Sequence, residues 1–479
     1  AKALEAAVDV GTITYTLGIT DSLANLVSGS AADLITVTTR TADVAITIND
    51  DAASNVTASN LSLVGGKTTG TVTVTNQLNV SGTNDESVAA FITAGTKVVA
   101  VDANGSANIT VSDVVDVSKA TALEDAVDVG TITYTSGLTD SLSTMAATTD
   151  GVNALTANFS TVTTRTTNIA VTMSDSSITV DANKAALVNL VKGATSVAVT
   201  ATLSGELQHL DNLTAHNDVD VLTITVTDSV AANNVAALNT VKASTTGNVG
   251  ATVASATFAQ LNALTTGDSD AITMTVSDAV IAANVTTLLG KTSDTTIVLS
   301  GGVSDSLANM VSSGANTTNM TNTLAADSDV NVTFSDVTGA TAQNITDLNK
   351  LCEISGTVTG ILTGTGSVLA NLSSSSTDPI TITVTDADDE TLTATSLTTL
   401  RGKTSSTVTA SNKVVITGSE SEMTAALVTA STKVTAATCK PSVSGSFAGS
   451  LAGIALLNAI AGATTQPVTA TLASIAQAI

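Results

Sequence analysis

Apolar and polar residues alternate along short stretches that end in aspartate, and this pattern recurs along the chain. Seven such stretches end at Asp50, Asp113, Asp175, Asp228, Asp278, Asp336 and Asp386, at separations of 63, 62, 53, 50, 58 and 50 residues. Alternation of this kind predicts β-strands with one buried and one exposed face. The similar separations predict a repeat protein with long repeats of 50–63 residues.

The stretch after Asp228 shows what one long repeat contains. Apolar residues at helical spacing predict helices over 229–241 and 255–266, and alternation predicts strands over 248–253 and 270–278. The sequence therefore predicts modules of one strand and one short helix, about 25–30 residues each, with two modules in a long repeat.

One module of this size cannot bury its own apolar face, whereas stacked modules can. Successive strands joined by helices form parallel sheets with right-handed crossovers. We therefore predict one continuous, elongated right-handed α/β solenoid over 1–479, with a long parallel sheet and with 441–479 as a candidate C-terminal coil or cap. The alternative is a string of Ig-like sandwiches, but those need about 100 residues and about seven strands each.

Two segments are nearly identical. "ALEAAVDVGTITYTLGITDSL" (Ala3–Leu23) returns as "ALEDAVDVGTITYTSGLTDSL" (Ala122–Leu142). Because the first copy starts at the beginning of the chain, we expect the chain to be a segment of a longer protein. We also expect each strand-ending aspartate to cap the helix that follows it.

Charge and composition exclude several classes of function. The chain has 41 acidic and 16 basic residues, a net charge of -25, and only 1% aromatic residues. Nucleic-acid binding needs clustered basic residues, so we expect none. The two cysteines, Cys352 and Cys439, form no disulfide framework or metal motif and are expected to be buried. No apolar run reaches the roughly 18 residues of a transmembrane helix.

The tripeptide Gly-Lys-Thr occurs three times and raises the question of nucleotide binding. It lies at Gly66–Thr68, Gly290–Thr292 and Gly402–Thr404. A phosphate-binding loop needs another glycine five residues earlier, where this chain has Leu61, Val285 and Leu397. A helix is also expected before each copy and a strand after it, the reverse of a phosphate loop. We therefore predict no nucleotide and interpret the glycine as a left-handed helix C-cap with lysine near the helix dipole.

Residues suited to catalysis are few. The two histidines, His209 and His216, lie near Asp211 and Asp218, where a metal or acid–base cluster competes with a solvated loop. We favour the loop and predict neither an enzyme nor a catalytic or cofactor-binding residue.

The candidate calcium site is an acidic cluster formed by Asp386, Asp388, Asp389 and Glu390. Calcium prefers such oxygen ligands. The competing interpretation is an acidic, well-capped helix start.

The segments "LLGKTSDTT", "LVGGKTTGTVTV" and "LRGKTSSTVTA" are similar to those of giant repetitive exported proteins of marine bacteria, especially cyanobacteria. This resemblance implies an extracellular or cell-surface structural role. We expect a surface-layer, filament or adhesin component that self-associates into a filament or sheet. The alternatives are a calcium-dependent adhesive module, a phage fibre segment and, less favoured, a polysaccharide-processing enzyme.

Overall fold

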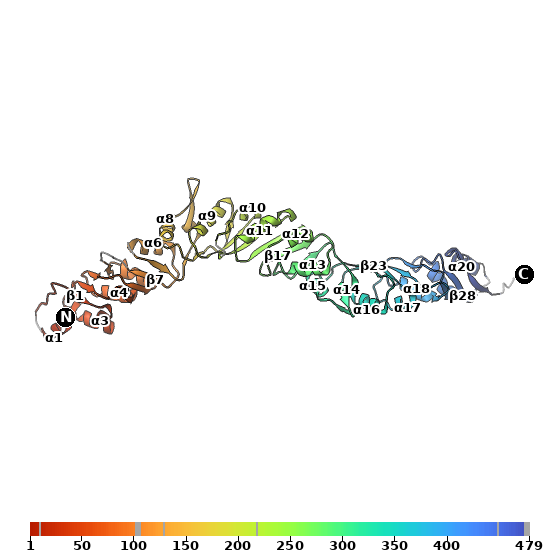
Figure 1. Ribbon diagram of the computed structural model, residues 1–479, viewed down its shortest axis with the longest axis horizontal. Coiled ribbons are helices and arrows are strands. Elements are labelled where there is room, and N and C mark those ends of the chain that lie inside the picture. The colour runs from red at the N-terminus through yellow and green to blue at the C-terminus, as the bar shows by residue number, and fades with distance from the viewer. Residues whose placement is uncertain (9–10, 101–106, 128–129, 217–218, 448–449, 474–479) are drawn as a thin grey trace. The chain divides into compact units, whose positions relative to one another are not determined.

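The chain is an α/β protein in which parallel strands alternate with short helices, as seen in a computed structural model (Figure 1). The structure describes residues 1–8, 11–100, 107–127, 130–216, 219–447 and 450–473. It divides into two compact units. The N-terminal unit comprises Ala1–Asp228 and Ala236–Ala251, and the C-terminal unit comprises Ser229–Val235 and Thr252–Ile479.

Parallel strands of the N-terminal unit form three groups. The first sheet has the order β1 (Ile19–Asp21), β2 (Ile46–Ile48), β4 (Val72–Val74), β6 (Val99–Ala100). The second has the order β3 (Asn55–Thr57), β5 (Asn79–Gly82), β7 (Asn108–Val111), β8 (Ile132–Tyr134). The third includes β9 (Leu138–Asp140), β12 (Val171–Met173), β13 (Ile178–Val180), β14 (Val199–Gly205) and β15 (Val221–Val230). An antiparallel hairpin, β10 (Ala146–Thr149) and β11 (Val152–Leu155), interrupts this pattern.

Short helices connect these strands. They are α1 (Lys2–Ala7), α2 (Leu23–Leu26), α3 (Ser28–Thr38), α4 (Ala58–Gly65), α5 (Asn84–Phe91), α6 (Val117–Ala126), α7 (Leu142–Met145), α8 (Ala157–Arg165), α9 (Ala182–Gly193), α10 (Leu207–Leu210) and α11 (Val235–Ala243). The 3-10 helix η1 (Ala232–Asn234) precedes α11, and β16 (Val249–Ala256) follows it.

The C-terminal unit repeats the same arrangement. Its strands are β17 (Ala271–Val276) with β18 (Ile297–Leu299); then β19 (Val303–Asp305), β22 (Val332–Phe334), β23 (Val358–Gly364), β24 (Ile380–Val384) and β26 (Val408–Ala410); and β25 (Thr391–Thr393), β27 (Val415–Gly418), β28 (Lys440–Phe447) and β29 (Thr469–Leu472). A short antiparallel hairpin is formed by β20 (Val311–Ser312) and β21 (Ala315–Asn316). Its helices are α12 (Phe258–Asn262), α13 (Ala282–Leu289), α14 (Leu307–Met310), α15 (Thr318–Ala326), α16 (Ala342–Leu351), α17 (Gly366–Leu369), α18 (Ala394–Arg401), α19 (Glu420–Leu427) and α20 (Leu451–Gly462).

Many modules contain two strands where the sequence predicts one. In the N-terminal unit, β4 joins the first sheet, β5 joins the second, and α5 completes the module. In other modules one longer strand takes the place of the two short ones. The first residues of β14 pair with β12 and its last residues pair with β13, and both partners belong to the preceding module. The predicted alternation of strand and helix is confirmed. The second strand of a module was not predicted, because its apolar run is too short to show a period.

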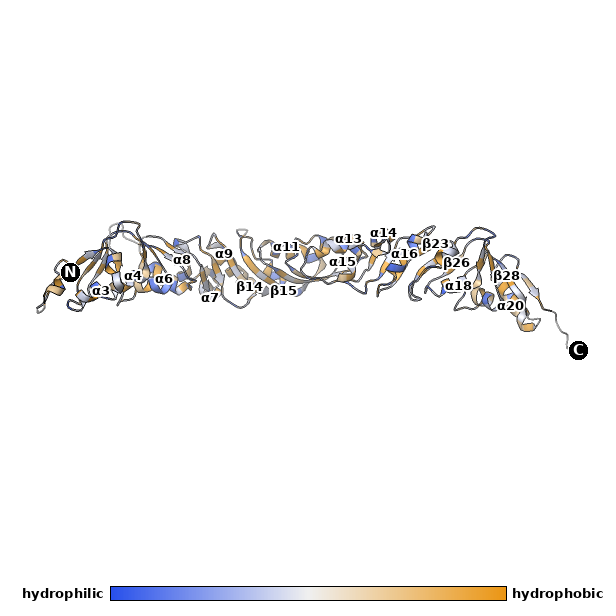
Figure 2. Cartoon of the chain, turned by 90° about the horizontal axis from the view of Figure 1, so that it is seen from below, coloured by the Kyte–Doolittle hydropathy of each residue, from blue (hydrophilic) through white to orange (hydrophobic). Residues whose placement is uncertain are grey.

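Small aliphatic side chains fill the space between strands and helices. Ile46, Ile48, Val72 and Val74 are at most 5% exposed, whereas the intervening threonines of β2 and β4 are partly exposed. Hydrophobic residues recur in the strands and helices of both units (Figure 2). This inward–outward alternation matches the period of two expected for strands.

The region 441–479, our candidate C-terminal coil or cap, contains most of β28, all of α20 and all of β29. Residues 448–449 and 474–479 of that prediction lie outside the described residues.

Candidate functional site

The strand-ending aspartates join successive modules. Six of the seven accept a hydrogen bond from the first amide of a helix in the preceding module, at distances of 2.6–2.8 Å: Asp50 from Leu23, Asp113 from Asn84, Asp175 from Leu142, Asp228 from Leu207, Asp278 from Phe258 and Asp386 from Gly366. The first amides of a helix lack partners within the helix, and a carboxylate there also meets the positive end of the helix dipole.

Our prediction that these aspartates cap the helix that follows them was therefore wrong. Other residues cap the helices that follow: Thr57 Oγ1 accepts from the Asn60 amide of α4 at 3.2 Å, and Asp116 and Asp181 cap α6 and α9. The seventh aspartate, Asp336, is exposed. The local pattern identified the right residues and the right kind of bond but the wrong helix.

The threonine of Gly-Lys-Thr also joins modules. Thr404 is 2% exposed and donates to the carbonyl oxygens of Ile380 (2.6 Å) and Asp378 (2.9 Å) in the preceding module. Its hydroxyl oxygen accepts from the amide of Ser406 at 2.9 Å. The same three-point arrangement recurs at Thr68, Thr195 and Thr464. The hydroxyl is thus fully engaged within the protein.

The glycines of this motif have ordinary helical conformations. Gly66, Gly290 and Gly402 have φ values of -74°, -73° and -70°. The left-handed C-cap that we predicted is therefore wrong. The helix before each copy and the strand after it are confirmed. Lys291 does lie at a helix end, where its Nζ donates to the carbonyl oxygen of Leu264, just after α12, at 2.7 Å.

Two clusters of glutamate, tyrosine and arginine, each around a buried glutamate, occur at equivalent places in the two long copies. Tyr15 donates to Glu5 at 2.8 Å, and Arg40 lies 3.2 Å from the other carboxylate oxygen. The second cluster contains Tyr134 and Glu124, 3.2 Å apart, and Arg165, also 3.2 Å from the carboxylate.

Sequence reasoning missed these clusters. The signal was available, because all three residue types recur in both copies.

Burial dominates the chemistry of the second cluster. Removal from water raises the pKa of Glu124, although the nearby Arg165 guanidinium opposes the shift. Burial and the Glu124 carboxylate together raise the pKa of Tyr134. Arg165 also donates to the carbonyl oxygens of Glu124 and Val127 near the end of α6. The cluster therefore fastens α8 to the end of α6, and its carboxylate is enclosed rather than open to a substrate.

A buried ion pair joins α9 to the residue before β15. Lys192 and Asp220 are both at most 1% exposed and lie 3.4 Å apart. The Lys192 ammonium also donates to the carbonyl oxygens of Thr214 (2.6 Å) and Ser244 (3.0 Å), and burial lowers its pKa.

The two histidines have different surroundings. His216 lines a cavity of about 130 Å³ beside Asp220, whereas His209 lies on α10, 3.9 Å from Glu206. Asp218 lies outside the described residues. Among the residues that the structure describes, no three His, Cys, Asp or Glu side chains form a group that could hold a metal ion.

The four residues of the calcium candidate bind separate partners. Asp386 is 7% exposed and accepts from the Gly366 amide. Asp388 accepts from the Lys413 amide at 2.9 Å, Asp389 pairs with Lys440, and Glu390 accepts from the Ala387 amide at 3.0 Å. Calcium binding here stays a prediction.

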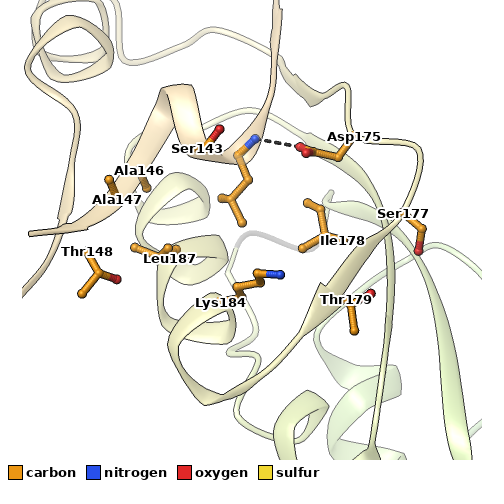
Figure 3. A pocket seen from close by; sticks show the side chains of 11 residues that line it. Ser143, Ala146, Ala147, Thr148, Asp175, Ser177, Ile178, Thr179, Lys184 and Leu187 are labelled. Carbon is orange, nitrogen blue, oxygen red and sulfur yellow. Dashed lines mark hydrogen bonds between the residues drawn. The ribbon is translucent and has the colours of Figure 1, made fainter. Parts of the chain in front are cut away.

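A pocket of about 400 Å³ lies beside the β10–β11 hairpin (Figure 3). Leu187 and Lys184 of α9 line it together with Asp175, whose carboxylate accepts from the Leu142 amide. The hairpin lies between Tyr134 and Arg165 of the second cluster, which are 31 positions apart. The corresponding residues of the first cluster, Tyr15 and Arg40, are only 25 positions apart, so the second copy carries an insertion here. From this hairpin, Ala146, Ala147 and Thr148 of β10 contribute to the lining of the pocket.

Comparisons with known proteins assign no family. No family model matches the chain, and neither a curated protein nor a solved structure matches it significantly. Among the described helices, none is long and apolar enough to cross a membrane.

Proposed function

We propose that this chain is a structural repeat segment, an elongated right-handed α/β solenoid of an extracellular or cell-surface protein that acts by self-association. The observation that carries the proposal is the use of polar side chains as links between successive modules. The aspartates and the Gly-Lys-Thr threonines are the residues that nucleotide or metal chemistry would need. Here their oxygen atoms are bonded to backbone groups of the neighbouring module.

The parallel registers support a continuous stack. In the N-terminal unit, Thr20 of β1 pairs with Thr47 of β2, and Thr47 pairs with Thr73 of β4, without a shift. In the C-terminal unit, Thr383 of β24 pairs with Thr409 of β26 in the same way. Stacked repeats that contact only their neighbours are the defining property of solenoids. The proposed location outside the cell rests on the sequence resemblance alone.

Net charge determines the conditions for testing self-association. A chain of net charge -25 repels its own copies over about 30 Å at 0.01 M salt but over only about 3 Å at 1 M. We expect sedimentation velocity to show mainly single chains at the lowest salt and growing assemblies as salt rises, with linear or sheet-like particles in electron micrographs.

The same measurements with added calcium, at constant ionic strength, separate specific calcium binding from charge screening. A single-chain species at every salt and calcium concentration would overturn the proposed function.

A further inference from the structure

Lys192 and Asp220 form a buried pair whose hydrogen bonds are unevenly distributed. Lys192 donates to the carbonyl oxygens of Thr214 at 2.6 Å and Ser244 at 3.0 Å. Its Nζ also lies 3.4 Å from Oδ2 of Asp220, yet this oxygen accepts no hydrogen bond from any residue that the structure describes. Both side chains are fully buried, so bulk solvent does not reach the contact.

The surroundings of Lys192 suit a neutral amine. An ammonium group has three N–H donors, whereas a neutral amine has two donors and one lone pair. The two carbonyl oxygens take two N–H groups, which leaves one position of Nζ for Asp220. Burial favours the uncharged form and lowers the pKa of Lys192, although the Asp220 carboxylate opposes this shift. A desolvated, neutral lysine amine is a nucleophile.

The other oxygen of Asp220 has a partner that suits an acyl group under attack. Oδ1 accepts from the amide of Val199, the first residue of β14, at 2.9 Å. A backbone N–H in this place stabilises the negative charge that develops on the oxygen when a nucleophile adds to the carboxyl carbon. Asp220 also lines the cavity of about 130 Å³ that contains His216, which has room for a water molecule.

A corresponding aspartate of the C-terminal unit lies near a cysteine instead. Asp378 precedes β24, is 3% exposed, and its Oδ1 accepts from the amide of Val358, the first residue of β23, at 3.0 Å. The Cys352 thiol, just after α16, lies close enough to Asp378 for the two charges to interact. The bond between aspartate and strand therefore needs no lysine, and Lys192 is an additional feature of the Asp220 site.

We propose that Lys192 and Asp220 join through an amide bond between Nζ and Cγ, an isopeptide cross-link that forms within the folded chain. One proton first passes from the ammonium to the carboxylate, so that a neutral amine faces a carboxylic acid. Nζ then attacks Cγ, and the bond between Cγ and Oδ2 breaks. Oδ2 leaves as water with the acid proton and one proton from Nζ, so the condensation needs no oxidant, reductant or co-reactant.

The geometry and the burial both favour this reaction. Nζ lies 3.4 Å from Oδ2, which is bonded to the carbon under attack, and productive complexes hold reacting atoms about 3–3.5 Å apart. A buried ion pair gains little stability because both charges lose their water, whereas an amide carries no charge. The new amide keeps the Val199 hydrogen bond at its oxygen and one of the two lysine-bound carbonyls at its N–H.

His216 is placed to move the proton that Nζ loses. Its Nδ1 is buried and has no hydrogen-bond partner in the described part of the chain, and the side chain lines the same cavity as Asp220. A histidine in this place can pass the proton to the leaving oxygen.

The cross-link spans β14 and α10, which lie between α9 and β15 along the chain. Its two residues are 28 positions apart. A covalent link of this kind restricts the unfolded chain and so stabilises the folded one. The inference concerns the interior of the N-terminal unit and does not depend on self-association.

Intact mass spectrometry of the full, denatured chain tests the bond directly. The linked chain should be lighter than its sequence mass by one water molecule. Trypsin does not cleave after an acylated lysine, so residues 185–242 should remain one closed peptide, also lighter by one water. The full sequence mass, with normal cleavage after Lys192, overturns the proposal.

Two substitutions on the same helix show whether the loss of water belongs to this pair. Lys192→Arg keeps the positive charge but removes the amine, and should have its full sequence mass. Lys184→Arg, at an exposed position of α9, is the matched control and should still be lighter by one water. A succinimide at Asp150–Gly151 would cause the same mass loss. A loss that persists in Lys192→Arg, or that maps to the peptide containing Asp150, therefore overturns the proposal.

A time course after cell-free synthesis tests the histidine. His216→Ala should lose water more slowly than the unmodified chain, because the proton then lacks its carrier. Equal rates would overturn the role of His216.

Discussion

Replacing Thr404 by valine tests whether the Gly-Lys-Thr threonine holds two modules together. Valine keeps the shape of threonine but removes the hydroxyl group. The Asp378 carbonyl keeps a hydrogen bond from the Ser405 amide at 3.0 Å. The Ser406 amide, however, loses the Thr404 acceptor at 2.9 Å, and the Ile380 carbonyl loses its donor at 2.6 Å. An unsatisfied buried group costs about 1–3 kcal/mol, so we expect a local loss of about 2 kcal/mol.

Native-state hydrogen exchange measures this loss at the Ser406 amide itself. A loss of about 2 kcal/mol corresponds to about 30-fold faster exchange of the Ser406 amide, if exchange requires opening of this link. Thr404→Ser keeps the hydroxyl and should retain most of the protection. Thr383→Val is the matched control on the outer face of β24, and its expected effect is within about 0.5 kcal/mol. Equal protection of Ser406 in Thr404→Val and Thr383→Val would refute the role that we assign to the hydroxyl.

Three further outcomes are expected. Asp278→Ala removes the carboxylate that accepts from the first amide of α12 and should destabilise the C-terminal unit by about 1 kcal/mol. Asp268→Ala, at an exposed position, should leave the melting temperature unchanged, and equal shifts for the two variants would contradict the link. Burial raises the pKa of Glu124. Above pH about 4.3, the ordinary pKa of glutamate, the folded protein therefore binds more protons than the unfolded chain. The free energy of unfolding consequently falls as pH rises from this value through the raised pKa of the folded state. Melting temperatures of Glu124→Gln should therefore fall less steeply with pH than those of the unmodified chain, and parallel curves would refute this. Burial raises the pKa of Cys352 to about 12 and of Cys439 to about 11, so a thiol reagent at pH 8 should label the folded protein much more slowly than the protein in denaturant; equal rates would show that the thiols are accessible.

Local sequence patterns predicted much of the local structure. The helix predicted over 229–241 overlaps α11, and the strand predicted over 270–278 contains β17. Both predictions depend on apolar periodicity, which the structure preserves because each element buries one face. Strands of only three residues, such as β3 and β25, give too few positions for a period to be recognised.

Bonds between modules could not be predicted in the same way. The partner of Asp278 is Phe258, 20 residues earlier, whereas local capping rules consider only the next few residues. The clusters around Glu5 and Glu124 need residues up to about 40 positions apart to meet, and only the comparison of the two copies could have suggested them. The Gly-Lys-Thr motif was correctly placed between helix and strand, but its glycines do not adopt the backbone conformation that the motif suggested.

Links between adjacent modules also bear on how such a chain can change its length in evolution. A link such as Asp278 to Phe258 spans one boundary, so duplication or deletion of a whole module regenerates an equivalent boundary and leaves the others untouched. The β10–β11 hairpin shows that an insertion inside a module is also accommodated, because the cluster of Glu124, Tyr134 and Arg165 still forms around it. Whole modules can therefore be added to or removed from such a chain without redesign of its core.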